Sequence, residues 1–467
     1  MKKIISLVLV LVMLFSLAGC SGNVKKDTAS NNKGADTNAD SASESSAAES
    51  NGGSGEKAPY SGTISIACGP LEAAALSEVL PEYQKKNPDV KLDTIITQTV
   101  TDFETMMTSW IASGTLPDMY IAQGGATEQG YAKSGYLLPL TDAGIKDRLV
   151  DGDLELFTYN NDLYAFPMAL SVSAVIVNKG ALAKAGVDLN ENNYPKNWQE
   201  FLSLLDKCVA AGIKKPLGIS GKDTSEVTAW TFQYMYQAIY GKNPNWYADV
   251  LRDKAAWNDD LYLEMFDKYA QMRPYIPDDA LGTDSDGMRK SFITGETPFI
   301  FQTAMVVGNI KALDPEVEIM VLPSCFTDDE KDQTLISGFD CGVSITKDAK
   351  NKELCFDFLD FLASEQGATI FNESTGYLPT TRDNDAKLDP AYDLIYEILD
   401  NNKLPNSPIL SRQWIAGIKE IVKAGQQDWF AGTDAKSVAD KIQEEHQRLV
   451  QADPDWVNEF LANYKDR

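Results

Sequence analysis

The stretch TISIACGPLEAAALSEVLPEYQKKNPDVKLDTII, residues 63–96, contains the pattern that decides the fold. Its first residues alternate between Ile and small or polar residues, which predicts a strand over 62–67. An amphipathic helix is predicted next from the helical spacing of Leu76, Val79, Leu80 and Tyr83. Residues 89–96 then predict a second strand. A strand, a helix and a strand in this order are the unit of a parallel sheet.

The same alternation continues along the chain. A second helix is predicted from Phe103, Met106, Met107 and Trp110, and a third strand over 118–122. A further series begins with the apolar run 174–178 and a helix whose stripe contains Trp198, Phe201, Leu202, Leu205 and Val209. Residues 298–302 and 316–322 are strand-like again, and 352–448 are predominantly helical. The predicted class is therefore α/β, with mostly parallel sheets that carry helices on their faces.

The composition of the 467-residue chain excludes several functions. Its 42 Lys and Arg against 68 Asp and Glu give a net charge of −26, which argues against nucleic-acid binding because phosphates are neutralised by clustered cations. His446 is the only histidine, so Ser–His, Cys–His and multi-histidine metal chemistry have at most one residue to use. It is in line with the apolar residues of a late helix, which favours a buried structural role.

The first residues have the pattern of an export signal. Lys2 and Lys3 precede an apolar run over 4–18, and Gly19 and Cys20 follow it. The letters LAGC at its end resemble a bacterial lipobox, which implies cleavage before Cys20 and a lipid on its thiol. Residues 21–58 are mostly small and polar, which predicts a disordered tether. We therefore expect a lipoprotein signal peptide over 1–19, a lipidated and flexible segment over 20–58, and a globular part at the extracellular face of the membrane.

Catalytic and cofactor signatures are missing from the sequence. There is no phosphate-binding loop, dinucleotide fingerprint, nucleophile elbow, zinc motif or calcium loop. The five cysteines after Cys20 have no metal-like spacing and are expected to be small buried side chains, although a Cys68–Cys341 disulfide is compatible with export. We expect no cofactor, no metal and no catalytic residue. The paired carboxylates of a glycosidase leave no short motif, so that class stays open.

A series of blocks in the middle and late chain connects this sequence to a known family. The blocks are SGTLPDMYIA (113–122), YAKSGYLLPLTD (131–142), YAFPMALSVSAVIVNKGAL (164–182), YPKNWQEFLSLLDK (194–207), SFITGETPFIFQ (291–302), GVSITKDAKNKELCFDFLDFLASEQG (342–367) and GYLP (376–379). In this order they resemble the family 1 extracellular solute-binding proteins of bacterial ABC importers, in particular the maltodextrin-binding type. The resemblance covers roughly 62–450.

The resemblance implies two α/β lobes that are joined by crossing segments and close on a sugar held in the cleft between them. Mapped onto this chain, the crossings fall near 168–173, 302–305 and 344–349. One lobe would then combine 59–168 with 302–345. The other would combine 169–301 with 346–467. Three crossings of this kind permit rigid-body closure without unfolding of either lobe.

A sugar site needs aromatic rings for the C–H faces, and Asp, Glu, Asn or Gln side chains for the hydroxyls. The family pattern puts Trp414 where the maltodextrin binders have a stacking tryptophan, and the alternative is packing within its helix. Trp230, in the segment DTSEVTAW, is the second aromatic candidate. Glu226 in the same segment is either a hydroxyl acceptor or a solvated helix residue.

Further candidates lie at strand ends and at the crossings. Gln123 and Glu72 each follow a predicted strand, where open α/β sheets bind ligands, although Glu72 could instead interact with the N-terminal dipole of its helix. The crossings and the cleft add Ser171, Gln302, Phe339 and Asp340. Met305 stands where the maltodextrin binders have a tryptophan, which argues against a malto-oligosaccharide as the ligand.

The resemblance implies a lipid-anchored receptor that captures a carbohydrate and delivers it to the permease subunits of an ABC transporter. It implies a monomer that is not an enzyme, binds no nucleic acid and contacts the membrane through its N-terminal lipid. Three alternatives stay open on the residues alone: a receptor of the same fold for a non-sugar solute such as a polyamine, a peptide or a phosphodiester; a membrane-tethered glycosidase; and a purely structural surface lipoprotein.

Overall fold

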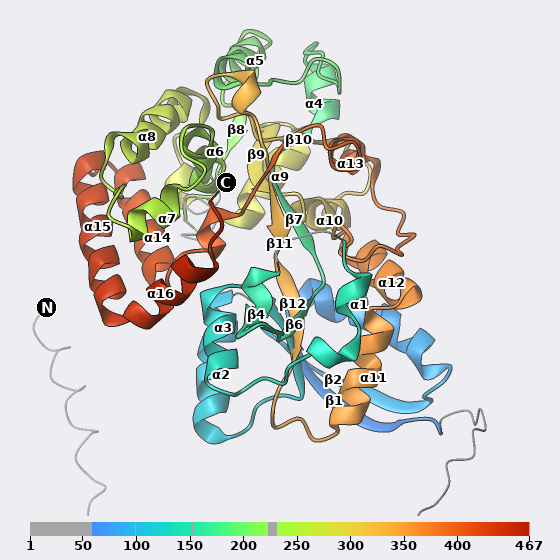
Figure 1. The fold of residues 1–467 in the computed structure, drawn as a ribbon. Coiled ribbons are helices and arrows are strands. Elements are labelled where there is room, and N and C mark those ends of the chain that lie inside the picture. Colours follow the sequence, from blue (N-terminus) through green and yellow to red (C-terminus); the bar gives the residue numbers. More distant parts are fainter. Residues whose placement is uncertain (1–57, 99, 151–153, 223–230, 467) are drawn as a thin grey trace, which may run out of the picture. The chain divides into compact units, whose positions relative to one another are not determined.

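The computed structural model describes residues 58–98, 100–150, 154–222 and 231–466, and Figure 1 shows their arrangement. The predicted signal peptide, the tether with Cys20, and the candidates Glu226 and Trp230 lie outside the described residues. The chain from Ala58 onward forms one compact unit with two main sheets and helices packed on them. The predicted α/β class is thereby confirmed. We call the first sheet with its helices the first lobe, and the second sheet with its helices the second lobe.

The first sheet has five strands in the order β2–β1–β3–β12–β6. Their bounds are Asp89–Ile96 (β2), Ser61–Cys68 (β1), Met119–Gln123 (β3), Cys341–Ile345 (β12) and Ala165–Pro167 (β6). Strand β1 pairs in parallel with both β2 and β3, and the antiparallel β12 joins β3 to β6. The three strands predicted from the opening stretch and its continuation are confirmed to within a residue or two, and so is their parallel order.

Helices from two separate parts of the chain cover the first sheet. They are α1 (Pro70–Gln84), α2 (Val100–Ser113), α3 (Ala126–Lys133), α11 (Lys352–Leu362) and α12 (Glu365–Thr375). In Figure 1 the orange helices α11 and α12 lie beside the blue N-terminal elements, although they come much later in the sequence: α11 contacts β1, and α12 packs on α1. The predicted stripe of α1 faces inward, with Leu76 and Val79 fully buried. Tyr83 from the same stripe donates a hydrogen bond to Asp357 of α11 at 2.8 Å, which ties the two helices together.

The second sheet has the order β13–β11–β7–β9–β8, with β10 also paired to β7. Its strands are Asn406–Ser407 (β13), Leu335–Phe339 (β11), Leu170–Asn178 (β7), Phe299–Thr303 (β9), Leu217–Gly218 (β8) and Ile319–Pro323 (β10). Strand β7 pairs antiparallel with β9, β10 and β11, so the expected mostly parallel sheet is wrong for this lobe. The partners of β7 are distant in sequence, and strand–helix alternation does not fix the direction in which such partners run. A two-stranded hairpin, β4 (Thr158–Tyr159) with β5 (Asp162–Leu163), lies apart from both sheets.

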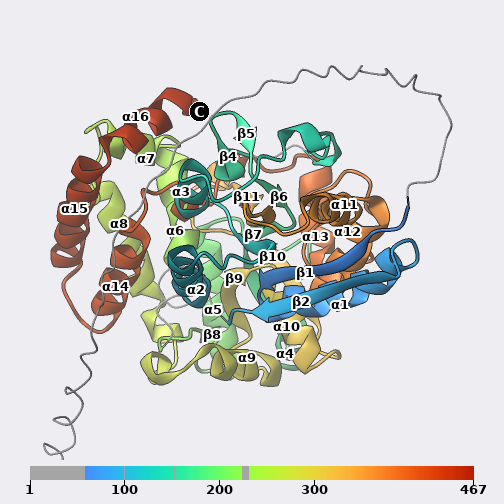
Figure 2. The same cartoon turned by 90° about the horizontal axis from the view of Figure 1, so that it is seen from below.

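The second lobe contains the larger set of helices. They are α4 (Lys179–Lys184), α5 (Trp198–Ala210), α6 (Thr231–Lys242), α7 (Trp246–Leu251), α8 (Asp260–Met272), α9 (Ser285–Thr294), α10 (Val306–Leu313), α13 (Asp393–Asp400), α14 (Ile418–Phe430), α15 (Ala435–Ala452) and α16 (Pro454–Asn463). The late helices α14 to α16 lie beside α6 to α8 in Figures 1 and 2. Their shared core is aromatic, with Trp246 and Trp257 fully buried. Trp198 and His446 are also buried, as their helical spacing predicted.

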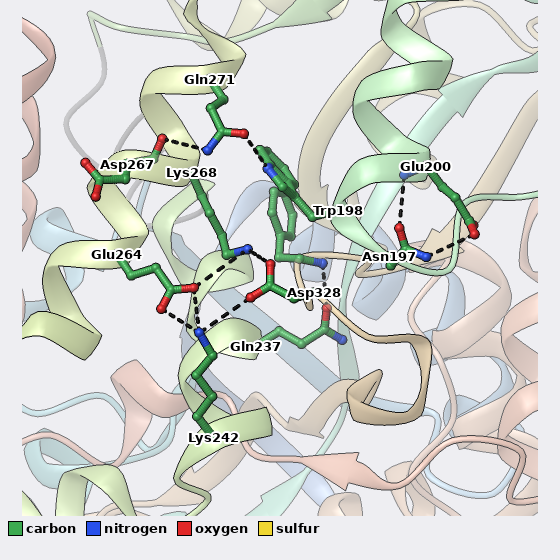
Figure 3. Close-up of polar contacts among 11 residues, drawn as sticks. Asn197, Trp198, Glu200, Gln237, Lys242, Glu264, Asp267, Lys268, Gln271 and Asp328 are labelled. Atoms are coloured by element: carbon green, nitrogen blue, oxygen red, sulfur yellow. Dashed lines mark hydrogen bonds and ion pairs between the residues drawn. The ribbon is translucent and has the colours of Figure 1, made fainter.

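A polar network joins helix α8 to the loop that follows β10 (Figure 3). The buried Lys268 ammonium contacts the Asp328 carboxylate and lies 3.8 Å from Glu264. Lys242 of α6 donates to the same Glu264 at 2.6 Å and lies 3.5 Å from Asp328. Two cations and two anions thus balance one another, which accounts for a lysine with little exposure to water.

The described part of the chain contains free thiols and no membrane span. Cys68, Cys208, Cys325, Cys341 and Cys355 are all buried and unpaired, so the expected burial is confirmed and Cys68 and Cys341 are not bonded to each other. Among the described helices, none is at once long enough and apolar enough to cross a membrane.

Three passages connect the lobes, and two of them differ from the expected positions. Strand β6 leads into β7 through Met168 and Ala169, which falls at the first expected crossing. The second passage is at Asp340, where strand β11 leads into β12. The third follows α12 and includes Leu378, whose carbonyl accepts a hydrogen bond from Leu170 N–H at 3.0 Å.

The expected crossings at 302–305 and 344–349 are wrong, and the assignment of 302–339 to the first lobe fails with them, while 341–345 do belong to it. Strands β9, β10 and β11 all belong to the second sheet, and β12 with α11 belongs to the first lobe. The same packing places 352–375, which had been expected in the second lobe, against β1 and α1. Family blocks mark where segments begin, but only long-range strand pairing decides to which sheet each strand belongs.

Candidate ligand-binding site

A pocket of about 300 Å³ opens where β1 and β3 end and α1 and α2 begin. Carboxyl ends of parallel strands and helix N-termini meet at such an edge, which is where open α/β sheets bind ligands. Its apolar wall contains Val100, Phe103, Ile121 and Met305. Its polar wall contains Glu72, Thr97, Gln98, Gln123, Asp340 and Tyr377. An apolar wall facing a few convergent polar groups is typical of small-molecule sites.

Glu72 is held at the N-terminus of α1. Gly69 is the N-cap and Pro70 is the first helical residue, so Glu72 is in the first turn, where the helix dipole favours a negative charge. Tyr377 donates its hydroxyl hydrogen to Glu72 Oε1. Burial, and next the Glu72 carboxylate, hold the pKa of Tyr377 well above its usual range. The phenol therefore stays a donor at neutral pH and fixes one carboxylate oxygen of Glu72.

Gln123 and Asp340 form a second polar group with Arg412, which lies in a short 3-10 helix (Leu410–Arg412). Arg412 donates to Gln123 Oε1 and to Asp340 Oδ1. The Arg412 and Asp340 side chains are each only 4% exposed. Removal of either partner of a buried ion pair strongly destabilises a protein, because the remaining charge is buried without compensation.

Lys419 adds a further cation near this pair. Burial, followed by the nearby charges of Arg412 and Lys423, lowers the pKa of Lys419 to about 7, although Asp340 acts in the opposite direction. The side chain retains some exposure to solvent, so water still reaches it.

The backbone around Asp340 joins the pocket to the passages between the lobes. Gly124 donates to the Asp340 carbonyl at 2.9 Å, and Asp340 donates to the Ala169 carbonyl at 3.0 Å. Three separate stretches of chain thus meet at one point. A change in the angle between the lobes would move these groups relative to one another.

Four of the predicted site residues meet at the pocket: Glu72, Gln123, Met305 and Asp340. Ser171 and Gln302 are buried in β7 and β9, and the Ser171 hydroxyl has no hydrogen-bond partner among the described residues. Phe339 packs in a small apolar cluster with Phe157. These three are therefore strand residues of the second sheet and do not line this pocket.

Trp414 lies in the aromatic core of the second lobe. Its ring packs edge-to-face against Tyr236 at 5.5 Å and Trp257 at 4.9 Å, and it is 5% exposed. It is not part of the pocket lining. It is buried against Tyr236 and Trp257 of other segments, and not within its own helix as the alternative expected, because Trp414 comes before α14 begins. Its role in binding stays a prediction, as do the roles of Glu226 and Trp230.

Tyr377, Arg412 and Phe103 are site residues that sequence reasoning missed. Tyr377 lies in the GYLP block, and Phe103 lies on the apolar stripe of a predicted helix. Both positions have a sequence signal, but that signal indicates family membership for Tyr377 and helix packing for Phe103. Arg412 is two residues before Trp414 and carries no motif. Its position against Gln123 and Asp340 follows only from the folded chain.

The described residues provide no obvious place for a metal. Within them, no group of three or more His, Cys, Asp or Glu side chains is arranged to hold a metal ion. The polar groups at the pocket are instead acceptors and donors suited to a hydroxylated ligand: two carboxylates, two amides, a threonine hydroxyl and a phenol.

The chain belongs to the family described as bacterial extracellular solute-binding protein, which it matches over residues 69–369. That family consists of solute-binding proteins and not of enzymes. The match includes the helix that carries Glu72, the strand that ends in Gln123, and the passage at Asp340. Arg412 lies beyond its end.

Relatives and solved structures agree with this assignment. The chain is 22% identical to a multiple sugar-binding protein of Streptococcus mutans over 35% of this chain and 36% of that protein. It is 27% identical to a probable sugar-binding periplasmic protein of Rhizobium meliloti over 46% of this chain and 50% of the relative. These matches thus span about a third to a half of the relatives' length. A solved chitin oligosaccharide binding protein superposes with a TM-score of 0.72 at 19% identity over 83% of this chain and 99% of that one, which shows a shared two-lobed fold.

Proposed function

We propose that this chain captures a carbohydrate, most simply an oligosaccharide, at the pocket between β1, β3 and the passage at Asp340. The observation that carries the proposal is the pocket itself: hydroxyl-recognising side chains face Phe103 and aliphatic residues at the edge where α/β sheets bind ligands. The sugar-binding names of its relatives support the same ligand class.

The captured sugar would be delivered to the permease subunits of an ABC transporter. The lobe extents that we infer from strand pairing and helix packing are 58–168 with 341–376 for one lobe, and 170–339 with 378–466 for the other. Closure of these lobes on the ligand would give the permease a state to recognise. The receptor would act as a monomer.

The ligand class is tested by thermal unfolding of the purified protein against a sugar panel. The panel contains chito-oligosaccharides, xylo-oligosaccharides, stachyose, raffinose and galactose, with spermidine and a tripeptide as controls. A sugar at about 100 times its dissociation constant stabilises by about 2.7 kcal/mol, which raises Tm by a few degrees. A rise with one glycan class supports the proposal. A rise with spermidine or the tripeptide alone contradicts it.

Variants assign that effect to the pocket. Glu72→Gln keeps the size of the side chain but removes its charge, and Gln123→Ala removes both the donor and the acceptor of the amide. Each is expected to weaken binding about tenfold or more, since a buried hydrogen bond to the ligand is lost. Glu444→Gln, on an exposed position of α15, is the matched control and should bind like the wild type. Equal binding by all three variants would place the site elsewhere.

We further propose that a lipid on Cys20 anchors the protein at the extracellular face of the membrane, which the lipobox-like sequence supports. Cys20→Ser in the full chain is expected to move the protein from the membrane fraction to the medium or periplasm. Retention of the variant in the membrane fraction would contradict the anchor.

A further inference from the structure

Arg412 does not line the pocket, but its guanidinium touches two residues that do. One terminal nitrogen donates to Gln123 Oε1 and the other donates to Asp340 Oδ1. Arg412 lies in the second lobe, where its neighbour Leu410 packs into the core, whereas Gln123 ends a strand of the first sheet. The two contacts therefore link the second lobe to the pocket wall.

These contacts determine how Gln123 is oriented. An arginine N–H can only donate, so the Gln123 atom that faces it must be the amide oxygen. The amide NH₂ is then turned away from Arg412, and among the described residues no hydrogen bond uses it. Asp340 gives Oδ1 to Arg412 and keeps its second carboxylate oxygen. Gln123 and Asp340 both line the pocket.

We propose that Arg412 is a positioning residue that fixes the hydrogen-bonding pattern of the pocket wall. It makes Gln123 present an N–H donor beside a carboxylate acceptor on Asp340. A hydroxyl group can accept from the first and donate to the second. The ion pair with Arg412 also offsets the Asp340 charge, so this Gln123–Asp340 part of the wall suits a neutral hydroxyl group better than an ammonium group. The inference rests on the proposed function and deepens it.

Gly125 allows Arg412 to come this close. Its backbone φ is +121°, which residues with a side chain rarely adopt, and a Cβ at this position would lie 3.0 Å from the Arg412 carbonyl oxygen. Gly125 itself donates to the Leu156 carbonyl at 2.8 Å. Gly125→Ala would therefore push the Arg412 segment away from β3 without changing any polar side chain.

The test is a double-mutant cycle on the panel sugar that stabilises the wild type. Arg412→Lys keeps the positive charge, but an ammonium cannot reproduce the two-pronged contact of a guanidinium. It is expected to weaken binding about ten- to a hundredfold, as is Gln123→Ala. Because the effect of Arg412 passes partly through Gln123, the double variant should lose clearly less than the product of the two single losses. Gly125→Ala should weaken binding in the same direction. Arg448→Lys, at an exposed site paired with Glu445, should have no effect.

A crystal structure of the sugar-free Arg412→Lys protein separates this inference from the proposed function. Here the Gln123 amide is expected to turn away from its position in the wild type. If the panel sugars fail to bind but Gln123 turns, the proposed function fails and the positioning role stands. If a sugar binds and the single losses multiply, or if Gln123 stays in place, the positioning role is overturned and the receptor function is unaffected. If Arg412→Lys does not fold, Gly125→Ala takes its place in the double-mutant cycle with Gln123→Ala.

Discussion

The two lobes bury titratable groups of opposite kinds. In the first lobe, Glu128 of α3 accepts hydrogen bonds from Tyr120 at 2.7 Å and Ser344 at 2.6 Å, yet burial raises its pKa to about 7. In the second lobe, His446 of α15 is 2% exposed beside the rings of Tyr247 and Trp257, and burial lowers its pKa to about 4. The cause is the same in both, since a buried site disfavours whichever form is charged.

Because one group is an acid and the other a base, this common cause gives the lobes opposite responses to pH. Between pH 6.5 and 4 the unfolded chain protonates His446 and the folded chain does not, so the second lobe loses stability as pH falls. Between pH 4.5 and 7 the folded chain keeps Glu128 protonated and the unfolded chain does not, so the first lobe loses stability as pH rises. The two effects oppose one another in a protein that unfolds as a whole.

The largest effect is expected from the aromatic core that surrounds His446. Trp257 is fully buried and packs edge-to-face against Trp246 at 5.0 Å and Trp414 at 4.9 Å. Trp257→Ala should lower the free energy of unfolding by about 3–5 kcal/mol, because a large cavity remains. Urea denaturation measures it, with the partly exposed Trp456→Ala as the smaller control. A loss below about 1 kcal/mol for Trp257→Ala would mean that this core is loosely packed.

The second-largest effect is expected on the pH dependence of stability, through His446. Lowering the pH from 6.5 to 4 should remove on the order of 3 kcal/mol through His446, because its pKa differs between the folded and unfolded chains. In His446→Gln this part of the pH dependence should disappear, whatever the stability of the variant at pH 7. Denaturation curves at pH 4.5, 5.5 and 6.5 test it. The same slope in wild type and variant would show that His446 is protonated in the folded protein.

Glu128→Gln tests the opposite side of the comparison. The amide can accept from one of the two hydroxyls and donate to the other, so packing is kept while the charge is lost. The wild type should lose up to about 3 kcal/mol between pH 4.5 and 7, and the variant should not. Urea curves at pH 5 and 8 are sufficient, since the variant should gain on the wild type at the higher pH. A variant that falls further behind at pH 8 would show that the ionised carboxylate is well stabilised.

The smallest effect is expected at the edge of the second lobe. Lys242 is 44% exposed, and its partners Glu264 and Asp328 are 30% and 58% exposed (Figure 3). Lys242→Met should cost less than about 1 kcal/mol, because water screens both charges. Its effect should shrink further in 1 M salt. A larger loss that does not depend on salt would show that water does not screen the contacts of Lys242 with Glu264 and Asp328.

Local pattern was enough for the parts of the chain whose neighbours are close in sequence. The run over 63–96 predicted β1, α1 and β2, because alternating and helical periodicities follow directly from backbone geometry. Glu72, Gln123 and Asp340 were predicted because ligands bind at strand ends and passages, which are recognisable in sequence, and all three line the pocket. The same pattern indicated the burial of Trp198 and His446.

Long-range pairing decided the rest. The sequence by itself determined the class of fold, the three parallel strands of the first sheet, the family and half of the polar pocket wall. Only the tertiary structure assigned β10 and β11 to the second sheet, packed Trp414 among aromatic rings, and brought Arg412 against Gln123 and Asp340. The physical reason is that strand pairing and buried ion pairs join groups far apart in the sequence, 72 residues for Arg412 and Asp340, and no local periodicity records which of them meet.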